Sequence, residues 1–301
     1  MTYLTARTVD HAAERPIVVT GSSGYLGTEL CKQFRLADID FIGVDKEPGG
    51  GSKTDVLNLA VEGPVRELFH EVSPGTVIHG GTHSAEAYRD DFVRAFNEDV
   101  MAVSNVLGAL SASSARLIFF SSSYVYSGLD STEPVDERTA LSPSHNFGVA
   151  KLFFEQFVLR NHPNSVVFRL SSVFGHGAQR HPNVIANMAA DCQVDGRLTI
   201  WGEGKRRMQY IHIQEVVLGV LESLTIAPGL YNLGGSEYTS VASAADQIAG
   251  FFDSAVEYLT EKPEGDTLPF MLTEKLRSAI PEYRSYPFAA ALEAYLARAP
   301  L

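Results

Sequence analysis

The sequence has 301 residues, of which 45% are hydrophobic and 20% charged, the composition of an ordinary globular protein of one or two domains. An excess of 36 Asp and Glu over 24 Lys and Arg gives a net charge of −12, which excludes broad attraction to nucleic acid or to an anionic membrane surface. No apolar run approaches the ~20 residues that a membrane-spanning helix needs. Residues 1–15 lack the apolar stretch of a secretory signal, so we expect a short leader on a cytoplasmic protein. The two cysteines lie far apart and no Cys/His cluster has zinc spacing, which predicts no structural metal.

Short apolar runs alternate with segments of helical period in the first half of the chain. The predicted strands are Ile17–Thr20, Phe41–Val44, Thr76–His79, Arg116–Phe120 and Val166–Leu170. The predicted helices are Tyr25–Leu36, Val61–Glu71, Ala87–Leu110 and Asn146–Arg160. The strands are continuous apolar runs, which are typical of a sheet covered by helices on both faces. The pattern therefore predicts an α/β fold with a doubly wound parallel sheet of Rossmann type.

The regular alternation ends near residue 172. Beyond it we expect a helix over 184–193, strands over 198–201 and 210–213, and a further helix followed by a strand over 230–233. Residues 14–172 are predicted to form the Rossmann-type domain, with 209–235 returning to it. Residues 173–208 and 236–301 are predicted to form a smaller domain that binds the substrate.

A glycine-rich segment lies where the first predicted strand gives way to the first helix. It reads Thr20-Gly21-Ser22-Ser23-Gly24-Tyr25-Leu26-Gly27. The first glycine permits a tight turn, the second lets the backbone approach a pyrophosphate, and the third lets the helix pack close to the sheet. The helix N-terminus then presents free N–H groups to the anion. With a strand before it and a helix after it, the segment predicts a dinucleotide site.

An acidic residue at the end of the second strand indicates which dinucleotide binds. Asp45 lies 18 residues beyond Gly27, where a carboxylate can accept hydrogen bonds from both ribose hydroxyls of an adenosine. It would repel a 2′-phosphate. Although Lys46 follows it, Asp45 predicts NAD rather than NADP.

Further motifs follow in a fixed order along the chain. They are Asp55-Val56, Val77-Ile78-His79-Gly80-Gly81, Ser121-Ser122-Ser123-Tyr124-Val125-Tyr126, Leu198-Thr199-Ile200-Trp201-Gly202-Glu203-Gly204, Tyr210-Ile211-His212-Ile213 and Tyr231-Asn232-Leu233-Gly234. From Ile17 to about Arg284 this series resembles the extended short-chain dehydrogenase/reductases, and among them the NAD-dependent epimerase/dehydratases that act on nucleotide sugars. The resemblance implies that Asp55, Val56, Gly80 and Gly81 lie against the cofactor. It also implies that Ser122 is catalytic and that Ser123 contacts the substrate.

The resemblance fails at one catalytic position. The family uses a Tyr and a Lys four residues apart on one helix face, and here the segment reads Phe147-Gly148-Val149-Ala150-Lys151. The resemblance implies that Lys151 holds the nicotinamide ribose, but Phe147 cannot carry a proton. Three explanations stay open: an engineered Tyr-to-Phe replacement, a natural enzyme that uses Tyr124, His145, His176 or water as its acid, or a cofactor-binding protein without turnover.

The substrate half departs further from the family. Met208 stands where the pyrophosphate-binding Arg often lies, Ser172 replaces a frequent Asn, and Asp99 takes the place of the fourth-helix Asn. Arg180, Arg206 and Arg207 are candidates to meet a diphosphate, with Ser123 and Ser172 beside the sugar. The leading hypothesis is an NAD-dependent enzyme that acts on a nucleoside-diphosphate sugar by transient hydride transfer, as a homodimer. The alternatives are an NAD-dependent hydroxy/keto oxidoreductase on a small molecule without a nucleotide, and a non-catalytic NAD-binding protein. Tyr124 stands where dehydratases of the family have an acidic residue, which argues against that branch.

Overall fold

A parallel sheet of seven strands forms the centre of the computed structural model, which describes residues 15–48, 54–177, 182–281 and 283–298. The strand order is β11-β6-β5-β4-β1-β2-β3, and every neighbouring pair is parallel. The strands are β1 (Ile17–Thr20), β2 (Phe41–Asp45), β3 (Thr54–Val56), β4 (Thr76–His79), β5 (Arg116–Ser122), β6 (Ser165–Leu170) and β11 (Gly229–Leu233). The order reverses at β1, which lies between β2 and β4, as in doubly wound α/β proteins.

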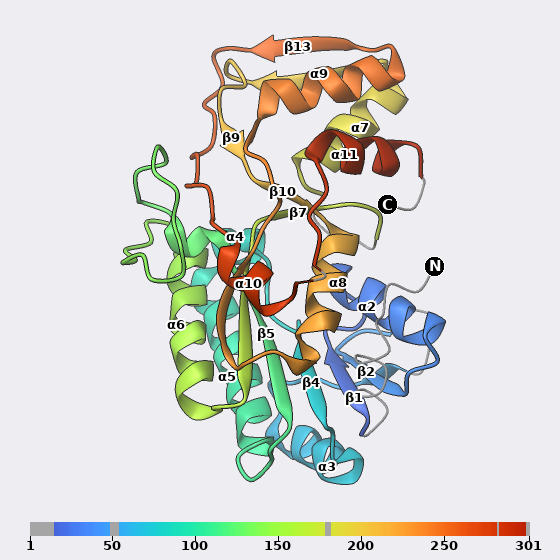
Figure 1. Cartoon of the computed structure of the whole chain (residues 1–301), viewed down its shortest axis with the longest axis vertical. Helices are drawn as coiled ribbons and strands as arrows, with labels where there is room; N and C mark the ends of the chain where they lie inside the picture. The colour runs from blue at the N-terminus through green and yellow to red at the C-terminus, as the bar shows by residue number, and fades with distance from the viewer. Residues whose placement is uncertain (1–14, 49–53, 178–181, 282, 299–301) are drawn as a thin grey trace.

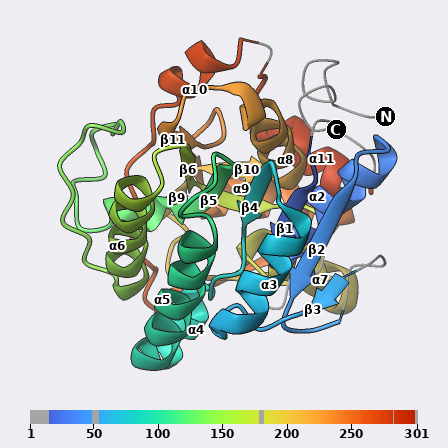
Figure 2. The same ribbon diagram turned by 90° about the horizontal axis from the view of Figure 1, so that it is seen from below.

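Helices cover both faces of this sheet (Figure 2). One face carries α2 (Tyr25–Leu36), α8 (Ile213–Glu222) and α10 (Glu274–Ala279), whose apolar side chains belong to one buried cluster. The other carries α3 (Glu62–Val72), α4 (Ala85–Asp90), α5 (Phe92–Ala109) and α6 (Asn146–Asn161) over a second cluster. Strands β1, β4 and β6 are buried along their whole length, which explains their unbroken apolar sequence.

A third apolar cluster lies at one end of the sheet, in the upper part of Figure 1. It is built from α7 (Val184–Asp195), α9 (Val241–Phe252), α11 (Phe288–Leu296) and the parallel pair β8 (Arg197–Trp201) and β13 (Ala255–Leu259). Two small pairs connect it with the rest of the chain: β7 (Ser172–Phe174) with β10 (Tyr210–His212), and β9 (Arg207–Met208) with β12 (Thr239–Ser240). Short 3-10 helices span η1 (Ser123–Tyr126) and η2 (Ser223–Thr225).

Most of the predicted strands and helices lie within a residue or two of their predicted bounds. The bounds of two predicted elements were wrong. The single helix expected over 87–110 is two helices, because the Asp91 side chain accepts a hydrogen bond from Arg94 N and so begins a new helix. The strand expected over 210–213 ends at His212, whose ring accepts from Gln214 N and begins α8. Residues 236–301, for which no element was predicted, contain β12, α9, β13, α10 and α11.

The predicted domain boundaries are not decided by this arrangement and stay a prediction. The described helices include none that combines the length and the apolar character needed to cross a membrane. The predicted leader lies almost entirely outside the described residues.

Candidate active site

The glycine-rich loop between β1 and α2 is built for close backbone approach. Gly21 has φ +70°, and a Cβ atom there would lie 2.6 Å from the backbone carbon of Gly80, at the end of β4. A Cβ atom at Gly27 would lie 2.1 Å from Gly21 O, so α2 packs directly on the loop. Gly24 is the N-cap of α2 and provides no side-chain cap, and a helix start of this kind is suited to an anion.

Asp45, at the end of β2, is tied to the same loop. Its carboxylate accepts hydrogen bonds from Ser23 N and from Glu47 N, both at 3.1 Å. Asp45 is half-buried, whereas Asp55 and Val56 on the outer strand β3 are exposed. The carboxylate therefore lies beside the glycine loop at the sheet edge where a dinucleotide binds in this class of fold.

Lys151 lies on the second turn of α6 with its side chain fully enclosed. Its Nζ donates to Thr82 Oγ1 at 2.9 Å and to Phe120 O at 3.0 Å. Burial lowers the pKa of Lys151 to about 8, while the carboxylates of Asp99 and Glu155 oppose that shift. A buried ammonium thus lies beside the carboxyl ends of β4 and β5, held by two oxygens and two nearby negative charges.

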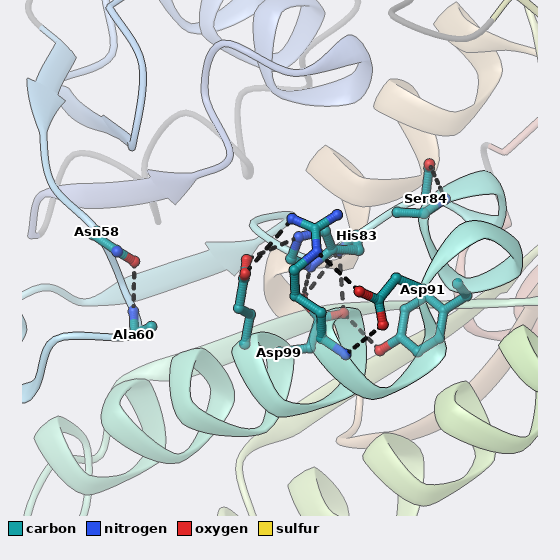
Figure 3. A network of polar contacts seen from close by, with 10 residues as sticks. Asn58, Ala60, His83, Ser84, Asp91 and Asp99 are labelled. Carbon is teal, nitrogen blue, oxygen red and sulfur yellow. Dashed lines mark hydrogen bonds and ion pairs between the residues drawn. The ribbon is translucent and has the colours of Figure 1, made fainter.

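One of those charges belongs to a compact polar network, shown in Figure 3. The buried Asp99 of α5 accepts hydrogen bonds from His83 N and from Tyr88 OH, and its Oδ1 lies 2.7 Å from His83 Nδ1. His83 Nε2 lies 3.1 Å from Glu98 Oε2. The network fixes the loop after β4, and therefore fixes the adjacent Thr82 against Lys151. Sequence reasoning missed Thr82 and His83, although both directly follow the two glycines that it singled out.

Phe147 takes the first-turn position of α6, one turn before Lys151. Its ring centroid lies 5.4 Å from Lys151 Nζ, 5.5 Å from the ring of Tyr88 and 5.8 Å from the ring of Tyr124. The side chain is 9% exposed. The position next to the lysine is therefore filled by an apolar ring with aromatic neighbours, and no acidic hydrogen is present on it.

The predicted serines are divided between two places. Ser122 ends β5, and its Oγ accepts from Tyr124 N, while Ser123 begins η1; both are half-buried. Ser172 begins β7 and pairs with Tyr210 of β10. Ser122, Ser123 and Tyr124 thus lie on the segment that packs against the start of α6, since Gly148 allows close contact with Tyr124 O.

The two described candidate arginines differ in their partners. Arg206 donates from Nε to Asp266 O, and its backbone N donates to Glu264. Arg207 Nη2 donates to Tyr238 O, and its guanidinium lies 4.1 Å from the centroid of the Tyr238 ring. Arg207 and Tyr238 line two adjoining cavities of about 610 and 310 Å³. The third candidate, Arg180, lies outside the described residues.

The sequence model of one family, described as the NAD dependent epimerase/dehydratase family, matches residues 17–234. The chain belongs to this family. NAD is accordingly its cofactor. The residues of the glycine loop fit that cofactor, because Ser22 Oγ is buried without a hydrogen-bond partner among the described residues, beside the uncapped start of α2.

Individual relatives are distant. The chain is 24% identical over 259 residues to the spore coat polysaccharide biosynthesis protein SpsK of Bacillus subtilis, which covers 84% of this chain and 86% of that protein. It is 25% identical over 267 residues to methionine adenosyltransferase 2 subunit beta of Xenopus laevis, covering 84% and 78%. The structure is similar to that of Thermus thermophilus UDP-glucose 4-epimerase in complex with NAD, with a TM-score of 0.83, 19% identity and coverage of 94% and 98%. At 19% identity, the similarity to the epimerase structure shows that the two proteins share a fold.

Proposed function

We propose that this chain is an NAD-dependent enzyme that oxidises and reduces a nucleotide-activated sugar by transient hydride transfer. The observation that carries the proposal is the combination of the glycine loop with Asp45 on one side and the buried Lys151 on the other. Bound NAD would supply a hydride acceptor. In this proposal the loop residues 21–27 hold the pyrophosphate, Asp45 accepts from the adenosine ribose, and Lys151 orients the nicotinamide ribose.

The substrate class rests on Arg207 and on the relatives. A protein with a net charge of −12 must attract an anionic diphosphate locally, and Arg207 presents its guanidinium to two cavities beside the β9–β12 pair. The UDP-glucose 4-epimerase and the polysaccharide biosynthesis protein, named above as similar, are in keeping with this class. In this proposal Ser122 bonds the reacting hydroxyl, and Ser123 and Ser172 lie toward the sugar.

A homodimer is part of the same proposal. The exposed sides of α5 and α6 carry an apolar aromatic group in which Phe96 lies 5.5 Å from Phe92 and 5.4 Å from Phe153, between ring centroids. Phe153 is 43% exposed and Val149 is 46% exposed. Covering this face with a second copy would remove the apolar area from water. A cytoplasmic location stays a prediction from composition.

A second candidate function is supported by Phe147. A protein with an intact cofactor loop and no phenol beside its lysine can bind NAD without turnover. The similarity to a protein named as a subunit of methionine adenosyltransferase is in keeping with this candidate.

Titration of the purified protein with dinucleotides and nucleotides tests the proposal. NAD should bind more tightly than NADP, and Asp45→Ala should weaken NAD binding while leaving the circular dichroism spectrum unchanged. Addition of UDP-glucose to the NAD complex should produce the absorbance of reduced nicotinamide or an epimerised product. Equal or tighter NADP binding would contradict the role of Asp45. If neither UDP nor dTDP binds, the proposed function would be replaced by that of an oxidoreductase on a non-nucleotide substrate. NAD binding without turnover would favour the second candidate.

A further inference from the structure

The proposed chemistry requires a proton donor that position 147 lacks. This inference rests on the proposed function, since reducing a carbonyl to an alcohol needs a proton on oxygen as well as a hydride on carbon. Phe147 fills the place beside Lys151 with a ring that has no polar atom. The donor must therefore be a neighbouring side chain or water.

Three tyrosines lie near the start of α6, and the hydroxyls of two of them already form hydrogen bonds within the protein. Tyr88 donates its hydroxyl hydrogen to Asp99. Tyr126 is fully buried, and its hydroxyl bonds with Asn232 and Arg169. Tyr124 differs from both, because it is half-buried and its hydroxyl has no hydrogen-bond partner anywhere in the described ranges. It is the tyrosine of this group that is free to bond a ligand.

The backbone holds Tyr124 against Phe147. Ser122 Oγ accepts from Tyr124 N at 3.3 Å and so begins η1. A Cβ atom at Gly148 would lie 2.1 Å from Tyr124 O, so glycine is what lets α6 approach η1 this closely. The ring of Tyr124 consequently meets the ring of Phe147 edge to face, at an interplanar angle of 74°.

His145 also contacts Tyr124. Its ring centroid is 4.7 Å from that of Tyr124, and its Nδ1 accepts from Phe147 N at the start of α6. With Nδ1 as the acceptor, the hydrogen of the neutral ring is on Nε2. Burial lowers the pKa of His145, with the charges of Asp266 and Arg89 acting on it in opposite directions. This lowered pKa favours the neutral form of the ring.

We propose that Tyr124 is the catalytic proton donor of this chain and that His145 is a positioning residue for it. In the reduction, the Tyr124 hydroxyl would give its proton to the substrate carbonyl oxygen. Reduced NAD, when bound, would supply the hydride to the carbonyl carbon, so that the C=O bond becomes CH–OH. The phenolate that forms regains a proton from water, while the His145 ring packed on Tyr124 keeps the phenol in place. Oxidation of the sugar runs through the same atoms in reverse.

Matched hydroxyl deletions test this role. Tyr124→Phe should lower kcat with UDP-glucose and NAD by about 10²–10⁴-fold, the usual contribution of a general acid, with unchanged NAD affinity. Tyr258→Phe, which removes a hydroxyl from the exposed face of β13, is the control and should leave kcat unaltered. Phe147→Tyr alone should change kcat by less than about tenfold, because the proton already has a donor. His145→Asn keeps a residue that can cap α6, and its loss of kcat should be partly rescued by added imidazole.

A second readout does not depend on turnover. In protein labelled with ¹³C at the tyrosine Cζ, one signal should be absent from Tyr124→Phe. In the NAD complex that signal should shift when UDP-glucose is added, and should not shift with UDP, because only the former carries the sugar.

The outcomes distinguish a failure of the proposed Tyr124 role from a failure of the proposed function. If UDP-glucose turns over and Tyr124→Phe keeps the full rate, or if Phe147→Tyr raises kcat a hundredfold or more, the role of Tyr124 is overturned and the proposed function stands. If no nucleotide sugar binds, the proposed function falls and this inference falls with it. A large loss in Tyr124→Phe, together with the sugar-dependent signal, supports both.

Discussion

The cofactor-facing part of this molecule relies on backbone contacts, and the substrate-facing part relies on side-chain contacts. The cofactor-facing part is mostly backbone: Gly21, Gly24 and Gly27 bring the loop, β4 and α2 together, and Asp45 is fixed by backbone N–H groups. The substrate-facing part depends on long side chains. Arg207, for example, is the exposed residue of β9 and contacts Tyr238. Backbone sites impose a strict sequence pattern, whereas a side chain can reach one ligand from several positions.

This difference explains why the family pattern persists in one part and changes in the other. A side chain at Gly21 or Gly27 would collide with backbone atoms, and one at Gly24 would lie only 3.1 Å from Gly21 O, so the motif has little freedom to vary. Met208, Ser172 and Phe147, by contrast, are side chains that depart from the family pattern in a chain that keeps the fold of the family. Phe147 is packed against Tyr88 and Tyr124, which shows that the phenol can be absent from a well-filled site.

The largest expected effect is on the free energy of unfolding, and it tests a buried ion pair between α6 and β6, next to the cofactor-facing part. Glu155 of α6 and Arg169 of β6 form a bidentate pair, with 2.9 and 2.7 Å between their bonded atoms, and both are almost fully buried. Glu155→Ala leaves the guanidinium buried without its counter-charge, so it should lower the free energy of unfolding by about 3–5 kcal/mol. Urea denaturation followed by circular dichroism measures the change.

An exposed pair on the same side of the sheet is the control. Arg66 and Glu62 of α3 lie 4.0 Å apart with side chains that are 74% and 73% exposed. Glu62→Ala should therefore change the free energy of unfolding by less than about 1 kcal/mol. Equal effects of the two substitutions would show that the buried pair does not stabilise this part of the fold.

The same contrast decides what the sequence could predict. The strands Ile17–Thr20 and Thr76–His79 and the helix Tyr25–Leu36 were predicted with their observed bounds, because apolar runs and a glycine-rich junction are local signals. The contact between Lys151 and Thr82 could not be predicted, since it joins residues 69 positions apart. The elements α9, β13 and α11 were missed because their apolar faces pack on one another in the third cluster, where no motif marks them.

A glycine substitution in the cofactor loop should have an intermediate effect. In Gly21→Ala the added methyl would lie 2.6 Å from Gly80, at a φ of +70° that favours glycine, so stability should fall by about 1–3 kcal/mol and NAD affinity should be lost. The matched variant is Gly63→Ala in α3, where no atom lies within 4 Å of the added methyl and stability should rise by up to about 1 kcal/mol. Thermal denaturation and NAD titration of both proteins check the comparison. Retention of full NAD affinity in Gly21→Ala would mean that the cofactor does not need this close backbone contact.

The smallest expected effect concerns the substrate-facing part. Each of the two side chains donates to one backbone oxygen, Arg206 to Asp266 O and Arg207 to Tyr238 O, but Arg207 also lines two cavities. If Arg207 makes one charge-assisted bond to a diphosphate near solvent, Arg207→Ala should weaken UDP binding by about 1 kcal/mol, roughly fivefold. Calorimetric titration at two salt concentrations measures this, and the loss should shrink at high salt because the contact is exposed. NAD affinity should stay unchanged in Arg207→Ala, since the cofactor lies on the other part of the molecule in this proposal. A larger loss of UDP affinity in Arg206→Ala than in Arg207→Ala would reverse the assignment and place the diphosphate along the loop that contains Asp266.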